Sequence, residues 1–341
     1  MKERINWIDW AKALAVCCVV FCHLPQSQEW YYYRFLQATI ITIFFWVSGY
    51  LKKDRGCTRD NWRKYSYGLI IPYFIYNAIV YPYWLVKYYM LNGGWPDILT
   101  AMKPIFGALL FENENAFCEP LNGPLWYLPA ILALHILVDI CKKTHYQHLI
   151  MITLCIASYF VYAANKQYEF LPNLTFIGII SRLPFYYIGY VMGQNKSLSF
   201  LSLNKMRDTA LCFSLIALGI LFFQWHMQTF YSGDHMLHIA LFYPVNLCFL
   251  FGVLYGCKSL NDVQSNIITN LSIGTLVIIG LHIVLVTIAN FTLEHTLGIN
   301  GSICYHWYTA LPTALAIIAL LYPIILWAKH HSPILLGRKK L

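Results

Sequence analysis

The sequence predicts an all-α fold, a polytopic transmembrane helix bundle of about ten spans that forms a single domain over residues 1–341. Composition is the first reason: 59% of the residues are hydrophobic and 11% are charged, whereas about a quarter are charged in soluble domains. The second reason is that apolar segments of about 17 to 25 residues, long enough to cross a bilayer core, recur along the whole chain. These segments leave no room for a soluble domain.

The ten predicted spans cover residues 8–24, 35–51, 65–91, 124–141, 148–164, 175–193, 209–225, 236–257, 271–293 and 308–328. Pro72 and Pro82 interrupt the third span, which neighbouring helices in a bundle can accommodate. Residues 96–111 are too few to span, so we expect an interfacial or re-entrant segment there. The basic N-terminus resembles the start of a secretory signal, but no small-residue cleavage site follows, so we interpret residues 8–24 as the first span.

The loops carry lysine and arginine unevenly. With a cytoplasmic N-terminus, the inner segments hold 18 of the 24 basic residues, and the outer segments hold only Arg34, Lys87, Lys103 and Lys166. By the positive-inside rule, this distribution predicts that both termini are cytoplasmic. The net charge of +9 is scattered between spans, so it indicates topology and not nucleic-acid binding. We therefore expect a multi-pass protein of the cell (inner) membrane. Its partners should include the lipid bilayer, and we expect no nucleic acid.

The eleven cysteines lie mostly inside the spans and form neither a CxxC pair nor a regular spacing. Such a pattern indicates neither a zinc site nor a disulfide framework. We interpret most of them as small apolar residues, and we expect no metal.

The first span carries three ionisable side chains, Asp9, Lys12 and His23. At 100° per residue, the eleven steps from Lys12 to His23 total three turns plus about 20°, so both lie on one helix face, roughly 16 Å apart along the axis. Because lipid exposure of a charge is costly, this face should meet the bundle interior or a wet cavity. Asp9 is placed to pair with Lys12. The alternatives are a Lys12 that snorkels to the cytoplasmic surface and an interfacial His23.

Other spans carry further candidates. Arg182 lies near the middle of its span, where snorkelling is hard, so we favour a cavity role. His282 is placed to pair within the bundle or to be a satisfied structural histidine. Ser48 ends the second span beside a glycine, where small residues allow close helix packing; no GxSxG context supports it as a nucleophile. His135 and Asp139, four residues apart, read as a structural helix pair.

Several of these stretches together resemble the acyltransferase-3 family of polytopic membrane acyltransferases. The shared features are a basic residue, ten further residues and a histidine in the first helix (Lys12, His23), then FFWVSGYL (Phe44, Phe45, Ser48, Gly49), PLWYL (Trp126, Tyr127), RLPFYYIGY (from Arg182) and IGTLVIIGLH (to His282). The resemblance covers essentially the whole chain, and it rests on the order and spacing of these motifs. The last two look most like the branch of sugar O-acetyltransferases such as fucose acetylases. One position departs from the family, whose usual first-helix arginine is Lys12 here; lysine keeps the charge and loses the bidentate fork.

The resemblance implies transfer of an acyl group, commonly acetyl from acetyl-CoA, to a hydroxyl of a cell-surface glycan or its lipid-linked precursor. His23 is then the general base or a transient acyl carrier, supported by Lys12 and Asp9. Lys12, Arg182, Ser48 and His282 are the candidates that line the donor path. The basic loop 52–64 is a weaker candidate for the donor phosphates, because topology alone also explains its charges.

Two other classes of function stay open from the sequence. A transporter or flippase, for a small solute or a lipid-linked sugar, would use intramembrane basic residues as a substrate or proton pathway, although no broken helices recur in two halves. A glycan polymerase or a structural membrane subunit is the third possibility. Acyl-CoA hydrolysis by the purified protein separates the first reading from the other two.

Overall fold

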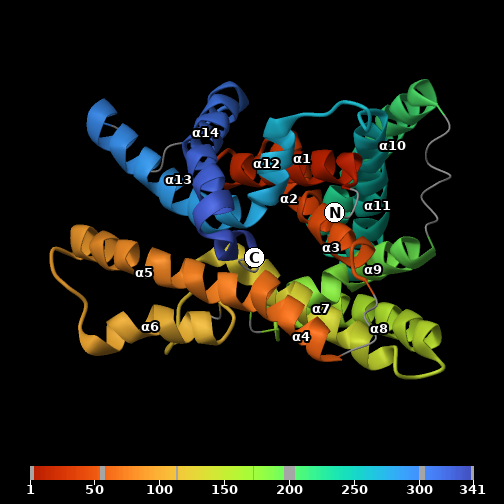
Figure 1. Cartoon of the computed structure of the whole chain (residues 1–341), viewed down its shortest axis with the longest axis horizontal. Coiled ribbons are helices and arrows are strands. Elements are labelled where there is room, and N and C mark those ends of the chain that lie inside the picture. The colour runs from red at the N-terminus through yellow and green to blue at the C-terminus, as the bar shows by residue number, and fades with distance from the viewer. Residues whose placement is uncertain are drawn as a thin grey trace.

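A computed structural model describes residues 4–53, 58–112, 114–171, 173–195, 204–298 and 304–338. Within these ranges the elements are helical, in the order α1 Asn6–His23, α2 Tyr31–Thr39, α3 Ile41–Tyr50, α4 Thr58–Tyr65, η1 Ser66–Ile70, α5 Ile71–Asn92, α6 Ile98–Leu109, η2 Gly123–Trp126, α7 Tyr127–Cys141, α8 Gln147–Tyr168, α9 Leu174–Asn195, α10 Lys205–Ser232, α11 His235–Ser259, α12 Asn266–Ile273, α13 Thr275–Leu297, α14 Trp307–His331 and η4 Pro333–Leu336. The predicted all-α fold is confirmed (Figure 1).

Eight helical segments of the described chain are long and apolar enough to cross a membrane. They coincide with eight of the ten predicted spans. The two other predicted spans correspond to α1, which carries three ionisable side chains, and to the pair α2 and α3, which are shorter helices of 9 and 10 residues. The segment expected to be too short to span contains α6, a helix of 12 residues whose first turn is capped by Asp97.

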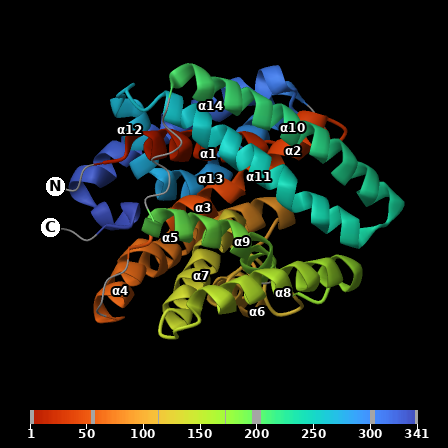
Figure 2. The same ribbon diagram turned by 90° about the vertical axis from the view of Figure 1, so that its right-hand side faces the viewer.

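Helix α1 lies inside the bundle and packs against α2, α3, α11, α12, α13 and α14. Figure 1 shows α4 to α9 gathered in the lower half of the molecule, and Figure 2 shows α10 and α11 crossing in front of α1. Eleven of the 18 residues of α1 are buried, among them Asp9. An interior position for this helix is what its polar side chains require.

Helices α3 and α9 approach each other closely because glycines line both sides of the contact. A Cβ added at Gly189 would lie 2.2 Å from the Trp46 carbonyl oxygen, and one added at Gly49 would lie 2.1 Å from that of Tyr186. Gly189 and Gly193 form a GxxxG spacing, the pattern that allows membrane helices to pack backbone against backbone. The expectation that the end of the second span packs closely through small residues is thus met at Gly49.

The third predicted span is one long helical segment, Arg59–Asn92, that contains a π-helical turn, Ser66–Ile70. The ring of Pro72 would clash with the carbonyl of the residue four positions earlier, Gly68, in a regular α-helix. The wider turn takes up this conflict without breaking the helix. The described chain therefore keeps the span continuous through its first proline.

Candidate functional site

Two histidines from distant parts of the chain meet at the end of α1. The imidazole of His23, the last residue of α1, lies edge-on against that of His282 in α13, with ring centroids 4.7 Å apart and an interplanar angle of 74°. His282 is fully buried, whereas His23 is exposed. The sequence analysis singled out both residues, but only the fold brings them together.

Hydrogen bonds fix which nitrogen of each ring carries a proton. Nδ1 of His23 lies 2.8 Å from the carbonyl oxygen of Val19, and Nδ1 of His282 lies 2.8 Å from that of Ile278. A carbonyl oxygen only accepts, so both Nδ1 atoms donate and both Nε2 atoms are left as acceptors. The buried Nε2 of His282 has no partner within the described structure. Two imidazoles in contact thus each keep an acceptor nitrogen, which suits the removal of a proton from a hydroxyl group.

The opposite end of α1 carries the other two candidates. Lys12 Nζ donates to the carbonyl oxygen of Ser272 over 2.7 Å, and the Ser272 hydroxyl donates to Asp9 Oδ1 over 2.6 Å. Asp9 also forms a salt bridge with Arg4 through both guanidinium nitrogens Nε and Nη2. The predicted pairing of Asp9 with Lys12 is therefore replaced by a two-pronged contact with Arg4. A guanidinium fork matches both oxygens of a carboxylate, which a lysine ammonium cannot do.

These contacts align α1 with α12 and with the first part of α13. Ser272 contacts the Lys12 end and His282 contacts the His23 end, so the two segments run in the same direction. The rise between Ser272 and His282 is roughly 15 Å, close to the roughly 16 Å between Lys12 and His23. Because α1 is one unbroken helix from Asn6 to His23, the predicted shared face of Lys12 and His23 follows from its periodicity.

Between Lys12 and His23 the same face of α1 carries Val16 and Val19, which are 0% and 5% exposed. Their positions, four and seven residues after Lys12, lie on the face that meets α13. Apolar packing therefore fills the direct line between the two polar ends.

A polar cavity of about 480 Å³ opens beside the Lys12 end of α1, and its lining residues are Arg4, Asn6, Asp9, Gln264, Ser265, Asn266 and Thr269. Arg338, from the C-terminal segment, is exposed and lies near it: partial desolvation, together with the charge of Arg4, lowers the pKa of Arg338. Arg4, Lys12 and Arg338 thus surround the single carboxylate of Asp9, an arrangement that attracts anions. Sequence reasoning missed Arg4 and Arg338, which lie outside the spans and match no motif.

Arg182 lies in a separate polar cluster. Its Nη1 donates to Thr42 Oγ1 at 2.7 Å and to Asn246 Oδ1 at 2.8 Å, and its Nη2 donates to the Ala38 carbonyl oxygen at 3.1 Å. The guanidinium also lies 4.6 Å from the ring centroid of Phe242. These partners belong to α2, α3 and α11, so the described contacts do not join Arg182 to the histidine pair.

The remaining candidates lie apart from the histidine pair. Ser48 is half-buried in α3 next to Gly49. Lys52, which the sequence analysis placed in a donor-binding loop, is only 4% exposed and forms a salt bridge of 2.6 Å with Asp139. Residues 54–57 of that loop lie outside the described residues. His135 bonds to the Tyr186 hydroxyl at 2.5 Å, so His135 and Asp139 have separate partners.

The fold and the site define a multi-pass membrane protein with two imidazoles in contact at one end of its central helix and a polar cavity beside the other end. The acyltransferase-3 family, described as an acyltransferase domain, matches residues 5–330, and the chain belongs to this family. Membership implies acyltransferase activity and an acyl donor. No curated protein and no solved structure matched the chain.

Proposed function

We propose that this protein transfers an acetyl group from acetyl-CoA to a hydroxyl of a cell-surface glycan or of its lipid-linked precursor. The observation that supports it most directly is the pair of histidines whose Nε2 atoms both remain acceptors. The resemblance of the last two sequence motifs to sugar O-acetyltransferases supports a glycan hydroxyl as acceptor.

In the proposed reaction, Nε2 of His23 takes the proton of the acceptor hydroxyl as its oxygen attacks the thioester carbonyl. The tetrahedral intermediate collapses with cleavage of the carbon–sulfur bond. The leaving CoA thiolate receives the proton from His23, so the base is regenerated and atoms and charge balance. His282, whose ring contacts that of His23, would support this step with its own acceptor Nε2.

The donor would bind from the opposite end of α1. Its phosphates suit the polar cavity that Arg4 lines, because Lys12 and Arg338 add positive charge near the Arg4–Asp9 pair. The pantetheine arm would extend roughly 16 Å outward to reach His23. Since Val16 and Val19 fill the direct line, the arm would run beside this face of α1. Transfer to an outer hydroxyl would then need no export of CoA.

Kinetics of acetyl transfer and of acetyl-CoA hydrolysis, measured on the purified protein in vesicles, test this proposal. His23→Ala should lower kcat by about two to four powers of ten, the usual contribution of a general base. Lys12→Ala should mainly raise KM for acetyl-CoA and reduce its salt dependence, while Lys12→Arg keeps the charge and should retain donor affinity. The surface variant His235→Ala serves as the control for loss of a histidine.

Near-normal turnover in His23→Ala would contradict the role of His23, and an unchanged KM in Lys12→Ala would contradict the donor path. A protein that neither hydrolyses acetyl-CoA nor transfers acetyl groups, but moves a solute across the vesicle membrane, would favour the transporter reading.

The proposal also needs His23 near the outer surface, as the distribution of basic residues predicts. Native Cys304 is exposed and lies in the last predicted outer loop, between residues 293 and 308. In intact cells a membrane-impermeant thiol reagent should label Cys304, and should label Gln28→Cys in a Cys304→Ser background. Lys205→Cys in the same background should react only after the membrane is permeabilised. Labelling of Lys205→Cys in intact cells would reverse the orientation.

A further inference from the structure

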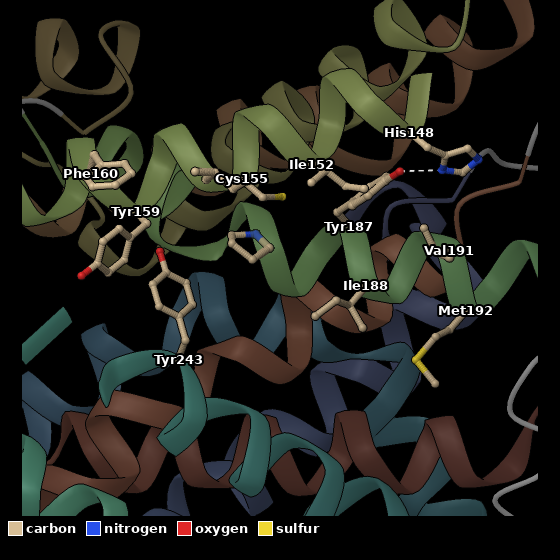
Figure 3. A pocket seen from close by; sticks show the side chains of 12 residues that line it. His148, Ile152, Cys155, Tyr159, Phe160, Tyr187, Ile188, Val191, Met192 and Tyr243 are labelled. Atoms are coloured by element: carbon tan, nitrogen blue, oxygen red, sulfur yellow. Dashed lines mark hydrogen bonds between the residues drawn. The ribbon is translucent and has the colours of Figure 1, made fainter. Parts of the chain in front are cut away.

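A long apolar groove runs between α8 and α9, on the side of the molecule away from the histidine pair. Its volume is about 880 Å³, and it is lined by His148, Ile152, Cys155, Ile156, Tyr159, Phe160, Pro184, Tyr187, Ile188, Val191, Met192 and Tyr243. Figure 3 shows His148 with Val191 and Met192 at one end and Phe160 with Tyr159 and Tyr243 at the other. The site described above uses none of these residues.

The helices that form this groove are all candidate membrane spans: α8, α9 and α11. Its surroundings are therefore hydrocarbon, and its apolar walls match a lipid chain. From His148 to Phe160 the groove follows α8 for roughly 18 Å at 1.5 Å per residue. Half of a hydrocarbon core of about 30 Å is about 15 Å. The groove thus has the depth of one leaflet, which fits a chain anchored at one membrane surface.

The end of the groove at His148 opens next to a basic turn. The turn between α7 and α8 carries Lys142, Lys143 and His145, all exposed, with no acidic residue between Lys142 and Gln147. At the groove itself, His148 Nδ1 bonds to the Tyr187 hydroxyl at 2.6 Å (Figure 3). The charge distribution predicts that this turn faces the cytoplasm, where anionic lipids gather and where basic residues between helices bind their headgroups.

We propose that the groove between α8 and α9 binds one anionic phospholipid of the bilayer, with an acyl chain along the groove and its phosphate at the turn that carries Lys142, Lys143 and His145. The apolar lining, the length of one leaflet and the basic mouth are three separate features that meet in this one ligand class. The proposal does not depend on the proposed function.

Native mass spectrometry of the full-length protein with added phosphatidylglycerol or phosphatidylcholine tests the headgroup. We expect one tightly bound phosphatidylglycerol and weaker phosphatidylcholine. A basic residue near the membrane surface contributes about fivefold to the affinity for an anionic lipid. The double variant Lys142→Gln/Lys143→Gln should therefore lower the affinity for phosphatidylglycerol about 30-fold. Lys205→Gln/Arg207→Gln, which removes the same charge from exposed positions at the start of α10, should leave it unchanged.

Binding of the lipid acyl chain in the groove is tested by Ile152→Trp, which fills the groove, and by the milder Ile156→Phe. Leu149→Trp is the matched control, because Leu149 is exposed on the same helix and does not line the groove. The two groove variants should lose bound phosphatidylglycerol, and the control should keep it. Helical content by circular dichroism shows that each variant is folded.

Three results would overturn the proposal: equal affinity for phosphatidylcholine, unchanged lipid binding in Ile152→Trp and Ile156→Phe, or displacement of phosphatidylglycerol by a lower concentration of an isoprenoid phosphate, which would make the groove an acceptor site. A dimer that Ile152→Trp disrupts would assign the groove to a second copy of the chain, and would overturn it too.

Discussion

The histidine pair and the Arg182 cluster are both polar groups inside an apolar bundle, yet their hydrogen-bonding atoms are used differently. Arg182 donates to three oxygen atoms of neighbouring helices and packs against an aromatic ring. Nδ1 of His282 donates to a carbonyl oxygen of its own helix, and the buried Nε2 has no partner in the described structure.

An unsatisfied buried acceptor costs free energy that folding alone gives no reason to retain. The Arg182 cluster is explained by the stability of the bundle, because its donors meet acceptors on the helices it joins. Under the proposed function, the acceptor hydroxyl would supply the donor that the histidine pair lacks. Position within a span is therefore a poorer indicator of function than the state of the partner atoms.

Among the variants that test this comparison, the largest expected effect is the loss of kcat in His282→Ala. Replacing His282→Ala should lower kcat by about 10- to 100-fold, since a hydrogen bond to a charged group contributes about 1.5 to 3 kcal/mol. KM for acetyl-CoA should change little, and His282→Gln, which retains an acceptor oxygen, should recover part of kcat. Steady-state kinetics on folded protein measures both. A variant with full turnover but a lower melting temperature would make His282 a packing residue.

Arg182 should show the opposite behaviour. Arg182→Ala removes one donor each from Thr42 Oγ1, Asn246 Oδ1 and the Ala38 carbonyl oxygen, while Asn246 Oδ1 keeps its bond from the Thr42 hydroxyl. The variant should lower the free energy of unfolding by about 1 to 3 kcal/mol. Arg182→Lys should not restore it, because a single ammonium cannot reach partners on both sides of a guanidinium. Thermal unfolding in detergent measures the loss, and the surviving folded protein should turn over normally. A raised KM for acetyl-CoA at unchanged stability would instead place Arg182 on the donor path, as its sequence context predicts.

Thr42 gives the smallest and cleanest test. Thr42→Val keeps the shape and removes one hydroxyl from the Arg182 cluster, so a loss of about 0.5 to 1 kcal/mol is expected, as for other hydrogen bonds between membrane helices. Thr39→Val is the control, because among the described residues its hydroxyl bonds to the carbonyl of Phe35 in its own helix and to no other helix. If both variants lose the same stability, the interhelical cluster contributes nothing of its own.

Sequence reasoning predicted the fold well because membrane spans are defined by length and hydropathy, which are local properties. It also predicted that Lys12 and His23 share a face, because helical periodicity is local. It did not predict that Asp9 would form its salt bridge with Arg4 instead of Lys12, because residues before the helix have no helical periodicity. The partners of His23 and Arg182 lie hundreds or scores of residues away, and only packing between helices selects them.

The position of His282 in the chain also bears on how the protein is made. His23 and its neighbours leave the ribosome early, and His282 follows 259 residues later by the numbering of the two positions. At about 5 to 20 residues per second this interval lasts about 13 to 52 s. Throughout it, α1 carries Asp9, Lys12 and His23 without the helix that covers them, at a cost of about 2.5 to 3.5 kcal/mol for each charge left in lipid. Stable insertion of the first helix should therefore wait for the ninth predicted span, so that chains released before α13 remain open to quality-control proteases in the membrane.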